Sequence, residues 1–276
     1  MRAQRHGTRV QMVTRRLLLL SLGYVASSEV PVRFPPPPPS LIAPGTVYRF
    51  DGWQLQTCWK SPRAVQGEAL QAYSSKHFYL EKSWRVPNAT ASTAAIVFVT
   101  PDNCSVHTAH STHPRTELRD LSVDDWSWPS TATPPTTTHR LTATLVVDHA
   151  AAGKPETVIA QIHGSVNEER AKIVKLRWTG GLVEARVKKP DPPYDEIGLS
   201  LGHYTCGDVL QYEIVADGAT GKLVVTVNGK QVEYSPPVNT KDRFYFKAGN
   251  YNQCDGLCNP SDYAKVRFHA VNATHE

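Results

Sequence analysis

The segment VLQYEIVADGATGKLVVTVNGKQVEY, residues 209–234, decides the fold class. It contains three runs of β-branched and apolar residues, which are separated by the turn-prone DGATG and by Asn228-Gly229. Asn-Gly is the favoured two-residue turn of a β-hairpin. The segment therefore predicts three consecutive antiparallel strands.

Similar runs continue on the N-terminal side, at residues 94–100, 141–149 and 157–164. No repeat of fixed length and no series of long amphipathic helices accompanies them, and a chain of 276 residues can bury a core between two sheets. We therefore predict an all-β fold, a jelly-roll β-sandwich of two antiparallel sheets, over residues 47–276.

The N-terminus has the pattern of a secretory signal peptide. Five arginines precede the apolar run LLLLSLGYVA at 17–26, and small residues follow it. The run is too short to span a bilayer, so residues 1–28 are interpreted as a cleaved signal and the protein as secreted, with no membrane contact after cleavage. A disordered basic arm is the alternative, and Met12 is an alternative start.

A proline-rich linker is predicted at residues 29–46, because PVRFPPPPPSLIAPG has no apolar periodicity of its own. The chain's formal net charge is +5, and residues 1–28 hold five arginines and no acidic residue, so the mature chain is formally neutral. Bulk charge gives no reason to expect a nucleic-acid partner. Attraction to a polyanion must come from a local basic cluster.

Cysteines and sequons fit an oxidising compartment. Of five cysteines, Cys254 and Cys258 flank the short loop CDGLC and form the disulfide candidate, with a zinc site as the competing interpretation. The odd count leaves one thiol free or intermolecular. Asn88, Asn103 and Asn272 begin N-glycosylation sequons.

Three polar strands carry the candidate chemistry, and the first is RTELR at 115–119. Side chains alternate faces along a strand, so Arg115, Glu117 and Arg119 share one face. Glu117 can hold the two guanidiniums in place, and these can bind carboxylates bidentately. An ordinary salt-bridged surface strand is the alternative.

The other two strands have the same alternation. Gln161 and His163 share a face in QIH, where Ile162 points to the core. In YFKAGNYNQ at 245–253, a glycine interrupts a polar face, and a strand glycine often marks the close approach of a ligand. We therefore expect a groove on this sheet; the polar face of the third strand comprises Tyr245, Lys247, Gly249, Tyr251 and Gln253.

The combined residue types indicate one kind of chemistry. The carboxylate pair of a glycosidase and a Ser–His–Asp arrangement around a nucleophile elbow are both absent from the sequence. Arginine, glutamine, histidine and tyrosine suit removal of the proton α to a carboxylate, which needs charge neutralisation, a base, and an acid at the leaving oxygen.

The blocks RTELR, QIH and YFKAGNYNQ, in this order, closely resemble the three motifs of polysaccharide lyase family 7, the alginate lyases. DGWQLQ at 51–56 and KLRWTGGLVEARVK at 175–188 are also similar, and the resemblance runs from about residue 47 to 270. It implies a jelly roll with a long concave groove. It also implies β-elimination on an anionic uronate polymer, alginate, without a required metal or other cofactor, by a monomer.

The resemblance also implies residue roles. Arg115 and Gln161 would bind and neutralise the uronate carboxylate. Tyr251 would donate a proton to the glycosidic oxygen, with or without abstracting the C5 proton itself. His163 would be the base or would hold the tyrosine's proton. The remaining positions would contact neighbouring sugars or, for Glu117 and Tyr245, organise and pack; they are Glu117, Arg119, Tyr245, Lys247 and Gln253.

Several points stay open. The isoleucine of QIH resembles members that accept guluronate or mixed blocks. His107, His110 and His113 precede RTELR at a spacing of three, but in a segment that is interpreted as a solvated loop rather than a metal site. A lectin-like binding module, a lyase for another polyuronate such as glucuronan, and a structural wall protein are the rival functions.

Overall fold

The computed structural model describes residues 41–59, 62–85, 92–104, 113–128, 137–164, 172–238, 241–254 and 258–276. The predicted signal peptide and most of the predicted linker lie outside these ranges. Among the described residues, no helix has the length and apolar character that crossing a membrane requires.

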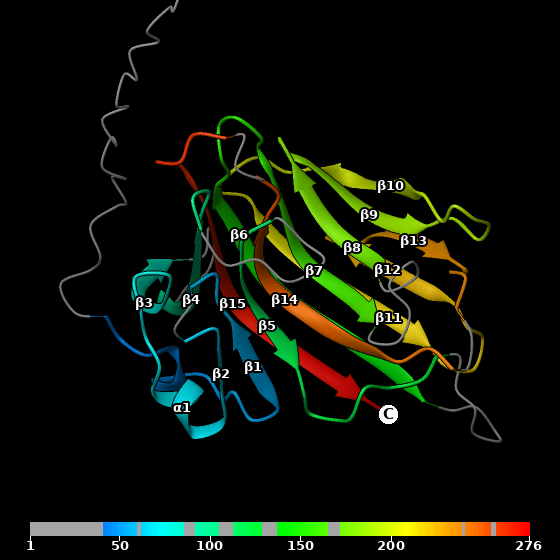
Figure 1. The fold of residues 1–276 in the computed structure, drawn as a ribbon, viewed down its shortest axis with the longest axis horizontal. Coiled ribbons are helices and arrows are strands. Elements are labelled where there is room, and N and C mark those ends of the chain that lie inside the picture. The colour runs from blue at the N-terminus through cyan, green and yellow to red at the C-terminus, as the bar shows by residue number, and fades with distance from the viewer. Residues whose placement is uncertain are drawn as a thin grey trace, which may run out of the picture. The chain divides into compact units, whose positions relative to one another are not determined.

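Fifteen described strands form two antiparallel sheets (Figure 1). The eight-stranded sheet has the order β10 (Glu196–His203), β9 (Leu182–Lys188), β8 (Lys172–Thr179), β7 (Glu156–Gly164), β14 (Phe244–Asn252), β5 (Arg115–Asp120), β1 (Trp53–Gln56) and β2 (Ala64–Gln66). The seven-stranded sheet has the order β13 (Lys230–Tyr234), β12 (Leu223–Val227), β11 (Val209–Asp217), β6 (Thr138–His149), β15 (Tyr263–His275), β4 (Ser92–Pro101) and β3 (Phe78–Arg85). The all-β prediction is confirmed.

The core lies where the alternating apolar side chains of the strands meet. Strand β12 alternates buried and half-buried residues along its whole length, as does β9. Fully buried aromatic rings, among them Phe98, Phe246 and Phe268, fill the interior. Burial of each such ring contributes about 1.5–3 kcal/mol.

The three strands predicted over residues 209–234 are confirmed as β11, β12 and β13. Asn228 and Gly229 form the turn between the last two, with φ angles of 46° and 83°. Both angles are positive, which is the requirement of the tight hairpin turn that Asn-Gly favours. This hairpin lies at the edge of the seven-stranded sheet, away from the three polar strands.

The end of the proline-rich segment packs on the domain. Residues Pro44–Thr46 form a 3-10 helix, η1, and the backbone N–H of Leu80 donates to the carbonyl of Ile42 at 2.8 Å. A single short α-helix, α1 (Gly67–Ala72), contacts η1 in the described part of the chain. The extended spacer that the sequence predicts therefore does not include residues 41–46.

Candidate active site

The three polar strands are neighbours in the eight-stranded sheet, in the order β7, β14, β5 (Figure 1). In the pairing register, Lys247 lies opposite Arg119 on one side and Gln161 on the other. Tyr245 lies opposite His163, and Tyr251 opposite Arg115. Directly opposed residues share a face of a sheet, so the polar side chains of the three blocks are gathered on one face.

Glu117 lies at the centre of this face and is fully buried. Its Oε2 accepts from Lys247 Nζ at 3.0 Å and lies 3.9 Å from Arg115 Nη1, while its Oε1 accepts from Gln161 Nε2. Burial lowers the pKa of Lys247 to about 8, and Glu117 opposes that shift. One carboxylate thus orders three side chains of the site.

The Gln161 amide is held in one orientation. Its Nε2 donates to the Glu117 carboxylate, so the amide cannot be reversed without placing two acceptors together. Its Oε1 is buried and has no hydrogen-bond partner among the described residues. An orphaned buried acceptor costs free energy, and a substrate hydroxyl at this position would satisfy it.

The His163 ring has a defined tautomer. Its Nδ1 lies 2.7 Å from the carbonyl oxygen of Gly164, which only accepts, so Nδ1 carries the proton and Nε2 carries the lone pair. Burial lowers the pKa of His163 to about 3, and the charges of Lys247, Lys172 and Arg115 act in the same direction. The imidazole is therefore neutral at physiological pH.

Tyr251 lies under a cation. The Arg115 guanidinium is stacked 4.0 Å above the centre of its ring, and the His113 ring meets the same ring edge-on at 6.0 Å. Cation–π contact of this kind fixes both side chains. His113 was expected in a solvated loop, and the structure places it beside Tyr251 instead. His107 and His110 lie outside the described residues.

Tyr245 contacts the site histidine directly. Its ring is stacked on the His163 ring, and its hydroxyl oxygen lies 3.0 Å from His163 Nδ1. The Arg119 guanidinium lies 3.8 Å from the centre of the Tyr245 ring and donates to Asp125 at 3.0 Å. Tyr245 therefore supports the position of His163 as well as packing.

Gly249 is required by the chain's own backbone. A Cβ atom there would lie 2.7 Å from the Glu117 Cα and 2.8 Å from the Thr116 carbonyl oxygen, and its φ is 150°. The sequence interpretation attributed this glycine to ligand approach. The structure corrects that reason: the glycine lets β5 approach β14 closely enough to bring Glu117 to the centre of the site.

Gln253 follows β14 and turns back on it. Its Nε2 donates to the carbonyl of Tyr251 at 3.0 Å, and its backbone N–H donates to Glu156 at 3.1 Å. The side chain is buried. These hydrogen bonds stabilise the end of β14, so Gln253 has a structural role there.

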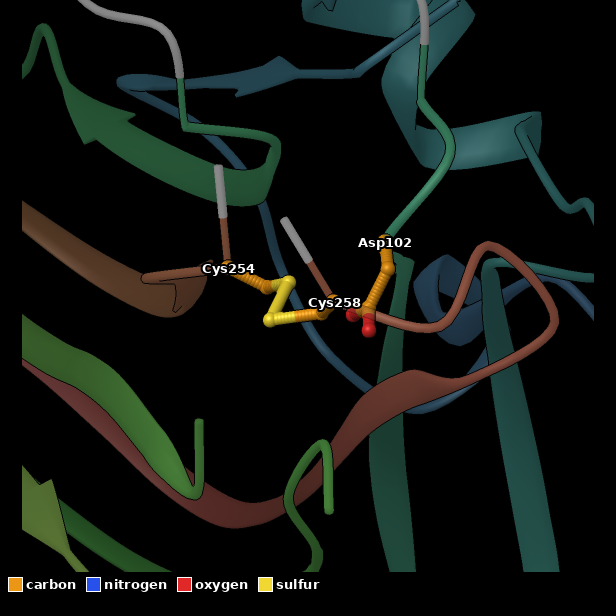
Figure 2. Close-up of side chains that lie close together, drawn as sticks. All are labelled: Asp102, Cys254 and Cys258. Atoms are coloured by element: carbon orange, nitrogen blue, oxygen red, sulfur yellow. A yellow bond between two sulfur atoms is a disulfide. The ribbon is translucent and has the colours of Figure 1, made fainter. Parts of the chain in front are cut away.

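The predicted disulfide between Cys254 and Cys258 is present, and Cys58 and Cys104 form a second one that the sequence did not indicate. Figure 2 shows the Asp102 carboxylate beside the first bridge, with one oxygen and both sulfurs within 4.8 Å of one another. The sulfurs are bonded to each other, so they are not thiolate ligands for the zinc site considered above. Cys206 is free and exposed.

Two asparagines that the sequence analysis missed fasten the site to the other sheet. Asn250 Nδ2 donates to the carbonyls of Phe98 and Ala264, and Asn252 Nδ2 donates to Asp102 at 2.6 Å. Both are fully buried. Asn250 and Asn252 alternate with Tyr251 along the strand, so the sequence places them on the opposite, core-facing side. A buried asparagine needs hydrogen-bond partners, and this pattern could have identified both residues.

Gln56 is a second omission. It lies on β1 opposite Glu117, and its Oε1 accepts from Lys247 Nζ at 2.6 Å. Gln56 and Glu117 together accept two hydrogen bonds from the buried ammonium. Of the sequon asparagines, Asn103 and Asn272 are exposed, while Asn88 lies outside the described residues.

Comparisons with known proteins bear on the family and on the fold. The family model described as "Alginate lyase" matches residues 48–275. Alginate lyase A1-II', a member of polysaccharide lyase family 7, superposes with a TM-score of 0.70 at 23% identity over 85% of this chain and 99% of that one. An alginate lyase from Pseudomonas aeruginosa gives 0.68 at 26% identity over 83% and 100%.

A further solved structure is a doubly substituted form of A1-II' in complex with a substrate denoted GGMG, with a TM-score of 0.70 at 22% identity over 86% of this chain and 98% of that one. The two substitutions replace a histidine by asparagine and a tyrosine by phenylalanine. No curated protein sequence matches the chain.

Proposed function

The chain belongs to the alginate lyase family, and we propose that its buried polar face cleaves alginate by β-elimination through Arg115, Gln161, His163 and Tyr251. The reaction removes the proton on C5 of a uronate. Its electron pair becomes the C4–C5 double bond, and the bond from C4 to the glycosidic oxygen breaks. That oxygen leaves with the bond's electrons and takes up a proton.

Arg115 and Gln161 neutralise the charge of the uronate carboxylate. The C5 proton becomes acidic only when the adjacent carboxylate is stabilised as charge develops on it. Arg115 supplies a guanidinium that is only weakly engaged by Glu117, at 3.9 Å. Gln161 has one N–H beyond the one given to Glu117, and its unpartnered Oε1 suits a sugar hydroxyl.

Proton transfer falls to Tyr251, with His163 as its neutral partner. A general base works best with a pKa near the working pH, and the pKa of His163 is about 3. In the substrate-free protein, His163 is thus a poor proton-abstracting base, but its Nε2 can accept a hydrogen bond. Tyr251, under the Arg115 guanidinium, is the group assigned to the C5 proton and the leaving oxygen.

The observation that carries this proposal is the gathering of all three motif blocks on one face around Glu117. A lectin-like module has no use for a neutral histidine of fixed tautomer on the same face as a tyrosine that is stacked under a guanidinium. The form of A1-II' that is solved in complex with substrate has a histidine and a tyrosine replaced, and these are the two residue types proposed here for proton transfer. We further propose secretion, from the leader pattern and the two disulfides.

The test is the ultraviolet absorbance of unsaturated uronate, followed over time with residues 29–276 and, separately, polymannuronate, polyguluronate and glucuronan. An increase in absorbance with polymannuronate or polyguluronate supports the proposal and gives the block preference. An increase with glucuronan alone supports the chemistry but overturns alginate as the substrate. No growth on any polymer, from protein with an intact near-ultraviolet circular dichroism spectrum, overturns the catalytic function.

A further inference from the structure

Strand β8 contains a β-bulge beside the catalytic histidine. Ile162 of β7 pairs with Val174, but the next residue, His163, pairs with Lys172, so Ile173 is an extra residue in β8. Ile173 and Val174 are both fully buried. A bulge of this kind changes the face to which the following side chains point.

The consequence is that Lys172 lies on the face of His163. Strict alternation from Lys175, which lies opposite Gln161, would turn residue 172 towards the core. The extra residue reverses this. Lys172, His163 and Tyr245 therefore lie on adjacent strands in one line across the sheet, next to the line formed by Lys175, Gln161, Lys247 and Arg119.

Lys172 differs from Lys175, Lys247 and Arg119 because no carboxylate of the described residues pairs with it. Lys175 contacts Glu196 at 2.6 Å, Lys247 contacts Glu117 at 3.0 Å, and Arg119 contacts Asp125 at 3.0 Å. Glu196 is the acidic group whose charge raises the pKa of Lys172, and it is already paired with Lys175.

The surroundings of Lys172 are strongly positive. Burial lowers its pKa, and Lys175, Arg115 and Lys188 act in the same direction against the single opposing charge of Glu196. Bringing an unpaired ammonium among other cations and partly out of water is unfavourable. A bound anion would remove that cost, and it would lie in the same line as His163, one strand, about 4.8 Å, away.

We propose that Lys172 binds the carboxylate of the sugar next to the one being cleaved, and so contributes to the affinity of this chain for an anionic polymer. This assignment rests on the proposed function, since it takes the uronate polymer as the ligand. Lys172 holds substrate and takes no part in proton transfer. Its loss changes binding rather than the chemical step.

The test compares the full chain with Lys172→Met, Lys172→Arg and, as a matched control, Lys222→Met, which removes an exposed lysine of the other sheet. Loss of one charge-assisted contact raises KM for the cleaved polymer about tenfold, with kcat nearly unchanged. Lys172→Arg retains the charge and most of the affinity. Added salt weakens the wild type more than Lys172→Met.

Binding without turnover separates this proposal from the proposed function. Equilibrium binding of alginate oligosaccharides is measured with Tyr251→Phe and with Tyr251→Phe/Lys172→Met by calorimetry. About tenfold weaker binding by the double variant supports the assignment, even if the wild type cleaves nothing. Equal affinity of the two variants overturns the assignment of Lys172, and so does the absence of binding by both. Wild-type cleavage decides the proposed function independently.

Discussion

The hydroxyl oxygen of Tyr245 lies 3.0 Å from Nδ1 of His163, and the two rings are stacked at 5.2 Å. The same Nδ1 lies 2.7 Å from the carbonyl of Gly164. Two oxygens and one ring face thus hold the imidazole so that Nε2 is the nitrogen left for substrate. Tyr245, which has no assigned role in proton transfer, therefore positions His163, which has one.

Tyr245→Phe is expected to reduce kcat only slightly. The stacked ring stays, and Gly164 still holds the Nδ1 proton, so the loss is that of one hydrogen bond, about 0.5–1.5 kcal/mol. Steady-state kinetics on the cleaved polymer measure the effect. A loss as large as that of Tyr251→Phe would show that Tyr245 itself takes part in proton transfer.

Tyr251→Phe is expected to lower kcat by about 10²–10⁴-fold, because the acid at the leaving oxygen is removed while the ring under Arg115 remains. KM and thermal stability should change little. Tyr263→Phe, on β15 of the other sheet, is the matched control and should retain activity. Wild-type turnover by Tyr251→Phe would rule out the assigned role.

Glu117→Gln is expected to destabilise the fold by about 3–5 kcal/mol, because it leaves the buried Lys247 ammonium without its carboxylate. Urea unfolding at neutral pH measures the change. Glu233→Gln breaks an exposed ion pair with Lys222 and should leave the midpoint unchanged. Equal midpoints for the two variants would mean that Glu117 does not order the site.

Gly249→Ala is expected to destabilise the fold by about 2–4 kcal/mol, from backbone strain and from contact with the Glu117 and Thr116 backbones. Gly207→Ala is a matched control, since its φ is 94° but nothing lies within 4 Å of the added Cβ. Thermal unfolding of both separates crowding from strain. Equal losses of thermal stability in the two variants would show that the close approach of β5 adds nothing to the cost of Gly249→Ala.

Stability should fall as the pH is lowered from about 6.5 to 4. Burial lowers the pKa of His139 to about 4 and that of His163 to about 3. The unfolded chain, with a histidine pKa of about 6.5, then binds more protons than the folded protein. The stabilisation is complete above that value and is lost as pH decreases towards the folded pKa values.

Unfolding free energies measured by urea titration across this pH range test the expectation. His139→Phe keeps a ring against Trp126, 4.1 Å away, and removes one titrating group, so its slope with pH should be smaller than that of the wild type. An unchanged slope would mean that His139 is not one of the groups responsible.

Much of the site was predictable because strand alternation is a local property. Arg115 and Glu117 share a face by spacing alone, and so do Gln161 and His163. The order of the strands was not predictable from spacing, since it depends on pairings between residues far apart in the chain. The Cys58–Cys104 bridge, whose partners have a sequence separation of 46, was missed for the same reason.

The sequence by itself determined the all-β class, the Asn228-Gly229 hairpin and the faces of the three polar strands, because turn chemistry and period-two alternation act over a few residues. Only the tertiary structure decided that Gly249 admits the backbone of β5, that Gln56 completes the environment of Lys247, and that a bulge turns Lys172 towards His163. These features arise where one strand meets another, and pairing between distant segments, not local propensity, sets that contact.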